Sequence, residues 1–145
     1  MLKTKDKGLE RVLIVKSSTD NLSVIRDFTK SSAAECGCTD EITNKIILAV
    51  DEACTNIIKH AYKFSPNGEI EVEIKLNKSK MVIDITDSGS HFDPNSVPNP
   101  NLIESQKQRR AGGLGIFLMK KLMDEVNYRI LNDNRNQVEL VKNLK

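Results

Sequence analysis

The sequence predicts an α+β sandwich, in which helices pack on one face of a mixed, mostly antiparallel sheet. Residues 69–76 (EIEVEIKL) alternate strictly between charged and apolar side chains, as a strand does when one face of its sheet is buried and the other is wet. Residues 39–61 instead repeat apolar side chains at helical spacing. The predicted order, β-α-α-β-β-loop-α-β-β, combines such elements in a single domain of 145 residues.

The N-terminal half is expected to supply one strand and two helices. Residues 11–17 (RVLIVKS) are short and rich in β-branched side chains, which favours a strand. Thr19 or Asp20 can cap a first helix, and Gly37 is a suitable place for it to end. The second helix should begin at Thr39. Its apolar stripe comprises Ile42, Ile46, Ala49, Val50, Ala53, Ile57 and Ala61.

The C-terminal half is expected to supply two hairpins and one helix. The first hairpin joins residues 69–76 to residues 81–86, after a turn of sequence SPNG. Residues 114–126 are amphipathic, which predicts a helix. Residues 126–131 and 137–141 then form the last hairpin.

Residues 90–111 are the one long irregular segment, with three prolines and several asparagines. A loop of about 20 residues within a compact domain is uncommon and usually functional, often as a lid.

Composition excludes several classes of function. The formal net charge of +2 is too small to indicate nucleic acid or an anionic membrane as a partner. No apolar stretch approaches the ~20 residues that span a bilayer, and the N-terminus lacks a signal-peptide pattern, so we expect a cytoplasmic protein. The cysteines are odd in number and the chain has only two histidines, His60 and His91, which disfavours a disulfide framework or a zinc site.

Glu52 and Asn56 are the first candidate site residues. They are four residues apart, so on a helix they lie on one face, one turn from each other. A carboxylate can accept a proton, and a carboxamide oxygen can ligate Mg²⁺. Polar pairs at this spacing also line many solvated helix faces. The pair indicates a nucleotide site only in combination with the glycine-containing elements that follow it.

Asp87, Ser88 and Gly89 directly follow an apolar strand. The carboxylate can accept a hydrogen bond from an exocyclic amine, and the glycine lets a ligand ring approach the backbone. Alone, this tripeptide is more typical of a strand-ending turn.

A second glycine-rich element opens the last helix. Its free N–H groups can hold phosphate oxygens, although a flexible hinge is the alternative interpretation. It is not a P-loop, which requires a Lys and a Ser or Thr after its glycines. Neighbouring cations suit a polyphosphate and favour a nucleotide site. The residues are Arg109, Arg110, Gly112, Gly113, Leu114 and Gly115.

Taken together, these residues resemble the GHKL (histidine kinase-like) ATPase superfamily. Residues 52–62 (EACTNIIKHAY) look like its N-box, and Asp87-Ser88-Gly89 and residues 112–115 look like its two glycine boxes. The resemblance spans residues 10–143 and is greatest to the partner-switching anti-sigma factor serine/threonine kinases. Phe92-Asp93-Pro94 and residues 112–126 (GGLGIFLMKKLMDEV) also match that subfamily. His91 stands where a D-x-G-x-G box has its second glycine.

The resemblance implies ATP and Mg²⁺ as cofactors. It implies that Glu52 is the general base, that Asn56 ligates Mg²⁺ and that Asp87 binds the adenine amine. Gly89, Gly113 and Gly115 would shape the pockets, and residues 93–113 would form the ATP lid. Arg109, Arg110, Gly112 and Leu114 belong to the same implied nucleotide site.

The resemblance also implies partners: a STAS-domain anti-anti-sigma factor as substrate, a sigma factor that competes with it, and a second copy of the chain in a homodimer. Two alternatives stay open. One is a non-catalytic, ATP-responsive binding module, which the presence of Glu52 disfavours. The other is a kinase domain of another partner-switching pathway or of a phosphorelay with a histidine acceptor. His60 is expected to have a structural or supporting role.

Overall fold

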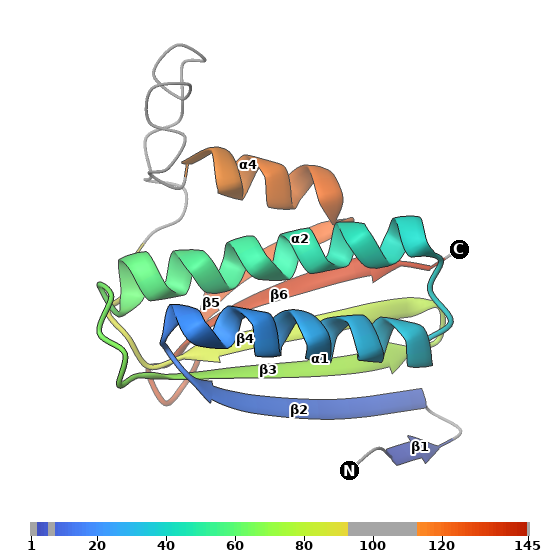
Figure 1. Ribbon diagram of the computed structural model, residues 1–145, viewed down its shortest axis with the longest axis horizontal. Helices are drawn as coiled ribbons and strands as arrows, with labels where there is room; N and C mark the ends of the chain where they lie inside the picture. Colours follow the sequence, from blue (N-terminus) through green and yellow to red (C-terminus); the bar gives the residue numbers. More distant parts are fainter. Residues whose placement is uncertain (1–2, 6–7, 93–112, 145) are drawn as a thin grey trace.

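The computed structural model describes residues 3–5, 8–92 and 113–144. They form a two-layer α+β sandwich, with a six-stranded sheet whose helices all lie on one face (Figure 1), and this confirms the predicted fold class. The strands are β1 (Lys3–Lys5), β2 (Gly8–Lys16), β3 (Glu69–Asn77), β4 (Lys80–Asp87), β5 (Glu125–Ile130) and β6 (Asn136–Asn143). The helical elements are η1 (Thr19–Asn21), α1 (Leu22–Glu35), α2 (Asp40–Asn56), η2 (Ile57–Ala61) and α4 (Gly113–Leu122).

Every strand pair that the structure describes is antiparallel, so the mixed character expected of the sheet is absent from the described strands. The strand order is β1-β2-β3-β4-β6-β5. β4 and β5 run in the same direction, but β6 folds back between them and pairs with both. Because β6 lies between them, β4 and β5 do not pair in parallel with each other.

Local capping chemistry explains the start of α2 and the end of α1. The start of α1 differs from the prediction, because Thr19 and Asp20 lie within η1 and Asn21, which precedes α1, makes no side-chain cap. Thr39 caps α2 as predicted, because its hydroxyl accepts a hydrogen bond from the backbone N–H of Ile42 at 3.2 Å. Gly37 follows α1 with a φ of 75°, a conformation that glycine adopts without strain.

The end of the last helix and the N-terminal edge of the sheet also differ from the prediction. The helix expected to reach Val126 ends at Leu122, because the N–H of Asp124 donates to the carbonyl of Val141 at 2.9 Å and β5 begins at Glu125. β1, which pairs with the start of β2, was not predicted.

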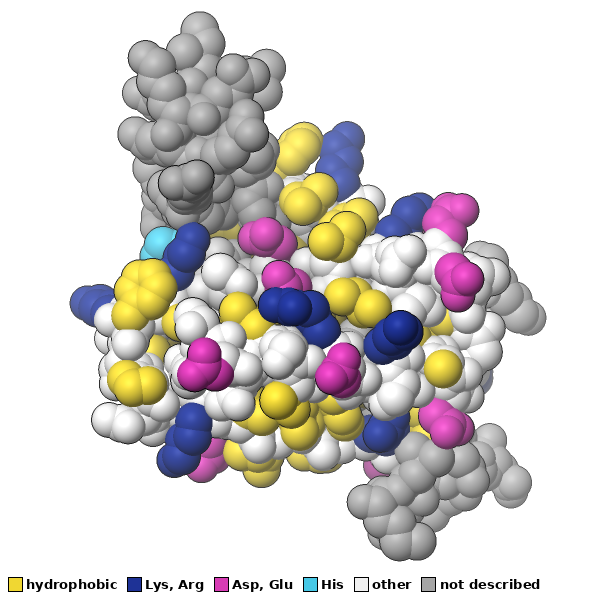
Figure 2. All heavy atoms as spheres, in the orientation of Figure 1, with side chains coloured by type: hydrophobic (Ala, Val, Ile, Leu, Met, Phe, Trp, Pro, Cys, Tyr) yellow, Lys and Arg dark blue, Asp and Glu magenta, His cyan; other side chains and the backbone are white. Residues whose placement is uncertain are grey.

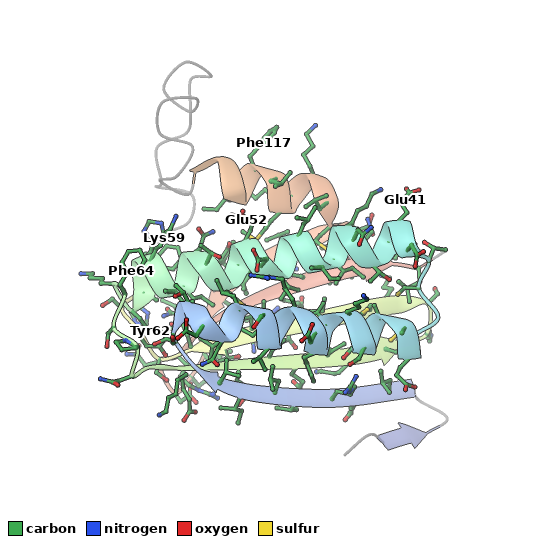
Figure 3. All side chains as sticks on the ribbon, viewed as in Figure 1. Glu41, Glu52, Lys59, Tyr62, Phe64 and Phe117 are labelled. Carbon is green, nitrogen blue, oxygen red and sulfur yellow. The ribbon has the colours of Figure 1, made fainter. Side chains whose placement is uncertain are left out.

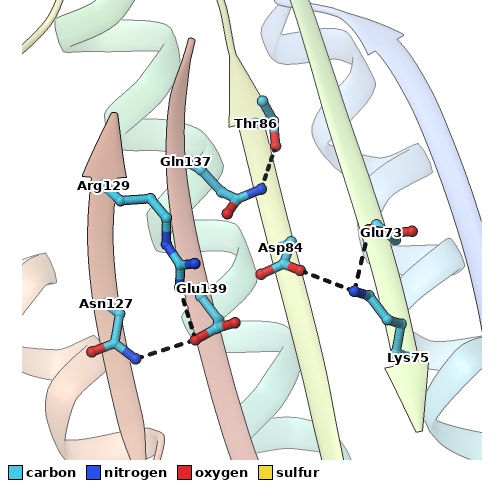
Figure 4. A network of polar contacts seen from close by, with 8 residues as sticks. All are labelled: Glu73, Lys75, Asp84, Thr86, Asn127, Arg129, Gln137 and Glu139. Carbon is cyan, nitrogen blue, oxygen red and sulfur yellow. Dashed lines mark hydrogen bonds and ion pairs between the residues drawn. The ribbon is translucent and has the colours of Figure 1, made fainter. Parts of the chain in front are cut away.

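The core lies between the sheet and the helices. Ile70, Val72 and Ile74 of β3 point toward α1 and α2 and are fully buried, as their alternation predicted. On the opposite face, polar side chains bond across β3, β4, β6 and β5 (Figure 4). Asp84 belongs to this network and is only 7% exposed, because neighbouring side chains cover it.

Acidic and basic side chains are interspersed over the helical face, and exposed apolar side chains gather on α4, where Phe117 is 55% exposed (Figure 2). Among the described residues, no helix is both long enough and apolar enough to cross a bilayer. Cys36, Cys38 and Cys54 are all free thiols.

The end of α2 departs from regular helix in a way that positions the site. The chain continues through η2, a single π-helical turn, and then through Lys63 and Phe64, which have φ values of 50° and 66°. Such π-helical turns often occur at functional sites.

Candidate nucleotide-binding site

A cavity of about 470 Å³ opens where the C-terminal end of α2 meets the ends of β4, β5 and β6. Its walls are largely apolar, with a few polar groups converging on it, which is the usual composition of a small-molecule site. The lining residues are Ala53, Asn56, Ile57, Asp87, His91, Phe92, Tyr128, Arg129, Ile130, Asn136, Gln137 and Val138.

Asn56 is the last residue of α2 and faces this cavity. Its side chain is 2% exposed, and its Nδ2 has no hydrogen-bond partner among the described residues. A buried amide without a partner is costly, and at a cavity wall this N–H donor is available to a bound ligand or a water. The same carboxamide carries an oxygen of the type that Mg²⁺ accepts beside water and phosphate oxygens, so this residue fits a bound Mg-nucleotide.

Glu52 lies on α2 (Figure 3), one turn before Asn56, as the spacing predicted. It does not line the cavity. Burial raises the pKa of its carboxyl group, the neighbouring charge of Asp51 raises it further, and Lys59 opposes the shift. A carboxylate whose pKa lies above its ordinary value is a better proton acceptor, which is the property a general base needs.

Asp87 ends β4 at the cavity wall and is 3% exposed. Its Oδ1 accepts hydrogen bonds from the Gly89 N–H and from Asn136 Nδ2, each at 2.9 Å. Burial raises the pKa of Asp87, while the hydrogen bonds from Asn136 and Gly89 and the nearby His91 hold the increase back. Asp87 is therefore a buried acceptor in the cavity wall, where a ligand amine can reach a carboxylate oxygen.

Gly89 is needed for a reason that the sequence did not reveal. A Cβ at this position would lie 2.6 Å from the backbone oxygen of Ala61, in the π-helical turn. The same oxygen accepts a hydrogen bond from the Ser90 N–H at 2.8 Å. The glycine thus lets the loop after β4 contact the end of the helix that carries Asn56.

The second glycine-rich element is only partly visible. Gly113, Leu114 and Gly115 form the first turn of α4, as predicted for a helix start. Arg109, Arg110 and Gly112, with most of the predicted lid, lie outside the described residues. Their assignments therefore remain predictions.

His60 occupies a supporting position next to the cavity. Its ring packs against Phe92, with 5.4 Å between ring centroids, and its Nε2 is buried without a partner among the described residues. Burial lowers the pKa of His60, which favours the neutral ring. This environment agrees with the structural role expected from the sequence.

Several cavity residues were missed by sequence reasoning. Tyr128 and Val138 are cross-strand partners on the helix-facing side of β5 and β6, and Asn136 is the cross-strand partner of Asp87. The alternation of β6 could have placed Val138 on the inner face, but nothing local indicated that this hairpin lies beside β4. Ile57, Ile130 and Phe92 complete the missed apolar wall.

Comparison with known proteins agrees with the fold. The family model described as "Histidine kinase-like ATPase domain" matches residues 15–142. Serine-protein kinase RsbW of Bacillus subtilis is 31% identical over 134 residues, which cover 90% of this chain and 82% of the relative. RsbW of Staphylococcus aureus is 35% identical over 117 residues, covering 77% of this chain and 74% of the relative.

Solved structures share the fold at low sequence identity. The RsbU and RsbW domains of Rv1364c from Mycobacterium tuberculosis match with a TM-score of 0.67 and 15% identity, over 93% of this chain and 32% of that one. The SiaB-SiaC complex from Pseudomonas aeruginosa matches with a TM-score of 0.59 and 14% identity, over 91% of this chain and 88% of that one.

Proposed function

This chain belongs to the histidine kinase-like ATPase family, and we propose that it is an ATP-dependent protein serine/threonine kinase that also acts as an anti-sigma factor. One observation carries the proposal. Asn56, buried and without a hydrogen-bond partner for its Nδ2 among the described residues, faces a cavity that also contains Asp87, and Glu52 lies one turn away. Asn56 supplies an amide for a Mg-nucleotide, and Asp87 supplies an acceptor for the nucleotide base. Glu52 supplies a carboxylate whose pKa is raised.

Each residue has a defined task in this proposal. Glu52 takes the proton from a substrate serine or threonine hydroxyl as that oxygen bonds to the γ-phosphorus of ATP and ADP leaves. Asn56 offers its carboxamide oxygen to Mg²⁺, which supplies charge neutralisation when bound. Asp87 accepts a hydrogen bond from the adenine amine. Phosphoryl transfer depends mainly on positioning and electrostatics, so this small set suffices.

The proposed substrate is a STAS-domain anti-anti-sigma factor, and the proposed competitor for the same chain is a sigma factor. In its unphosphorylated form the substrate would hold this protein away from the sigma factor, and phosphorylation would release it. We further propose that the protein acts as a homodimer in the cytoplasm. The similarity to serine-protein kinases supports the kinase activity, whereas the substrate class, the competing sigma factor, the homodimer and the location are carried over from the family resemblance.

The test is transfer of phosphate to a defined substrate. The purified chain is incubated with Mg-ATP and a STAS-domain protein from the same genome, and intact masses are measured. We expect the STAS protein to gain one phosphate. Glu52→Gln should abolish the gain while ATP affinity is kept, because the amide has the same shape but cannot take a proton. Glu41→Gln, at an exposed position of the same helix (Figure 3), is the matched control and should behave as wild type.

Other outcomes would favour the alternatives. ATP binding without transfer to any STAS protein would indicate a non-catalytic regulator. A phosphorylated product that loses its phosphate in acid would indicate a histidine acceptor, since phosphoserine survives acid. If Glu52→Gln lost nucleotide affinity as well as transfer, its assignment as the base would be wrong.

A further inference from the structure

Asn136 is joined to Asp87 by a side-chain hydrogen bond that no local sequence pattern indicated. The two residues are cross-strand partners on β6 and β4, and both line the cavity. Asn136 Nδ2 donates to Asp87 Oδ1 at 2.9 Å, to the Gly89 carbonyl at 3.1 Å and to the Ser90 carbonyl at 3.4 Å. The side chain thus connects the carboxylate to the backbone that follows it.

These three acceptors determine the orientation of the Asn136 amide. Only its NH₂ group can face a carboxylate and two carbonyls, so its Oδ1 must point the other way. There it contacts His91 Nδ1, while His91 Nε2 lies 3.1 Å from Asn134 Oδ1. Since an amide oxygen can only accept, this contact is a hydrogen bond when His91 Nδ1 is the donor.

We infer that Asn136 and His91 are positioning residues for recognition of the nucleotide base: His91 orients the Asn136 amide, and Asn136 orients Asp87. The inference rests on the proposed function, in which Asp87 accepts a hydrogen bond from the adenine amine. Protein donors, Asn136 Nδ2 and the Gly89 N–H, engage Asp87 Oδ1. The other carboxylate oxygen is then held in one direction for the ligand.

The consequence is selectivity for a 6-amino purine over a 6-oxo purine. A carboxylate fixed by its neighbours accepts from an amine, but it repels a carbonyl oxygen placed at the same point. Sites of this kind discriminate strongly, because the wrong ligand leaves a buried polar group without a partner. Asp87, at 3% exposure, is buried enough for this effect. If Asn136 or His91 is removed, Asp87 can turn and the discrimination weakens.

The experiment compares the affinities for ATP and inosine triphosphate, measured by calorimetry with Mg²⁺ present. The wild-type chain should prefer ATP. Asn136→Ala should lower the ratio of the two affinities by about tenfold, the equivalent of one charge-assisted hydrogen bond. His91→Phe keeps a ring but removes the donor and should lower the ratio in the same direction, and His91→Gln, which can donate again, should restore part of it.

Asn127→Ala is the control. Asn127 is an exposed amide on β5 that bonds Glu139 on the opposite face of the sheet, so the ratio should not change. A general loss of protein stability would lower the affinities for both nucleotides alike and leave their ratio unchanged. His91 is exposed, so its variants should remain folded even if Asn136→Ala does not.

The outcomes separate this inference from the proposed function. A wild-type chain that binds neither nucleotide would refute both. A wild-type chain that binds ATP selectively, with a ratio unchanged in Asn136→Ala and His91→Phe, would overturn this inference alone. If the affinity ratio changed in Asn136→Ala but not in His91→Phe, His91 would have no part in positioning Asp87.

Discussion

Gly89 lies directly against Ala61, so close that a Cβ on residue 89 would be 2.6 Å from the Ala61 carbonyl oxygen. This contact joins the loop after β4 to the π-helical turn that ends α2. Asp87 and Asn56, which face one cavity from these two elements, are therefore held at a defined separation. Gly89 is therefore required for packing, in addition to the ligand role proposed for it.

Gly89→Ala should therefore lower both stability and nucleotide affinity. We expect the free energy of unfolding, measured in urea, to fall by about 1–3 kcal/mol, the usual cost of overpacking. Gly37→Ala is the comparison, because a Cβ there meets no atom within 4 Å and only its φ of 75° is strained. That variant should lose about 1 kcal/mol and keep wild-type ATP affinity. Unchanged stability in Gly89→Ala would contradict the contact.

Asn56→Ala should separate binding from stability. Affinity for Mg-ATP should fall at least about tenfold, because a ligand contact is lost. The unfolding free energy without nucleotide should stay within about 1 kcal/mol of wild type, since Nδ2 has no partner among the described residues. Asn44→Ala, at an exposed position of the same helix, should change neither quantity. Unaltered Mg-ATP affinity in Asn56→Ala would remove this residue from the site.

The pH dependence of phosphate transfer should report the ionisation of Glu52. A base must be deprotonated, so the rate should fall as the pH is lowered through the pKa of Glu52, which lies above its ordinary value. Asp51→Asn removes the like charge that helps to raise this pKa. The acidic limb of the profile should move to lower pH, and a limb that stays in place would argue against Glu52 as the base.

Asp84→Asn should stabilise the protein at neutral pH. Burial, followed by repulsion from Glu139, raises the pKa of Asp84 in the folded state, whereas Lys75 opposes the rise. The folded protein therefore holds this proton more strongly than the unfolded chain, and stability is lost as the pH rises through the folded pKa. The amide keeps the shape and cannot ionise. The ion pair lost with Lys75, which is 41% exposed, is of small value.

Urea unfolding at pH 4 and pH 7 measures this effect. We expect a gain of about 1 kcal/mol for Asp84→Asn at pH 7 that shrinks toward pH 4. Asp133 is the control, because its hydrogen bonds and its pairing with Arg135 lower its pKa, the opposite of the shift at Asp84. Asp133→Asn should lose stability at neutral pH rather than gain it. Equal stability of wild type and Asp84→Asn at both pH values would disprove the destabilising effect of the buried, ionised Asp84 carboxylate.

The sequence by itself determined the features that depend on neighbouring residues. The period-two alternation of β3 placed Ile70, Val72 and Ile74 on the inner face, and the cap at Thr39 set the start of α2. The i, i+4 spacing put Glu52 and Asn56 on one helix. Backbone geometry and side-chain period set these features locally, so a short stretch of sequence contains the information.

Only the tertiary structure decided which distant segments meet. Asn136 and Asp87 bond across 49 residues because β6 folds back between β4 and β5, a choice of strand order that no local pattern contains. The pairing of β5 with β6 ended α4 at Leu122, since it places Glu125 opposite Val141. Contacts of this kind depend on the combined burial and hydrogen bonding of whole elements, which override the preference of any one segment.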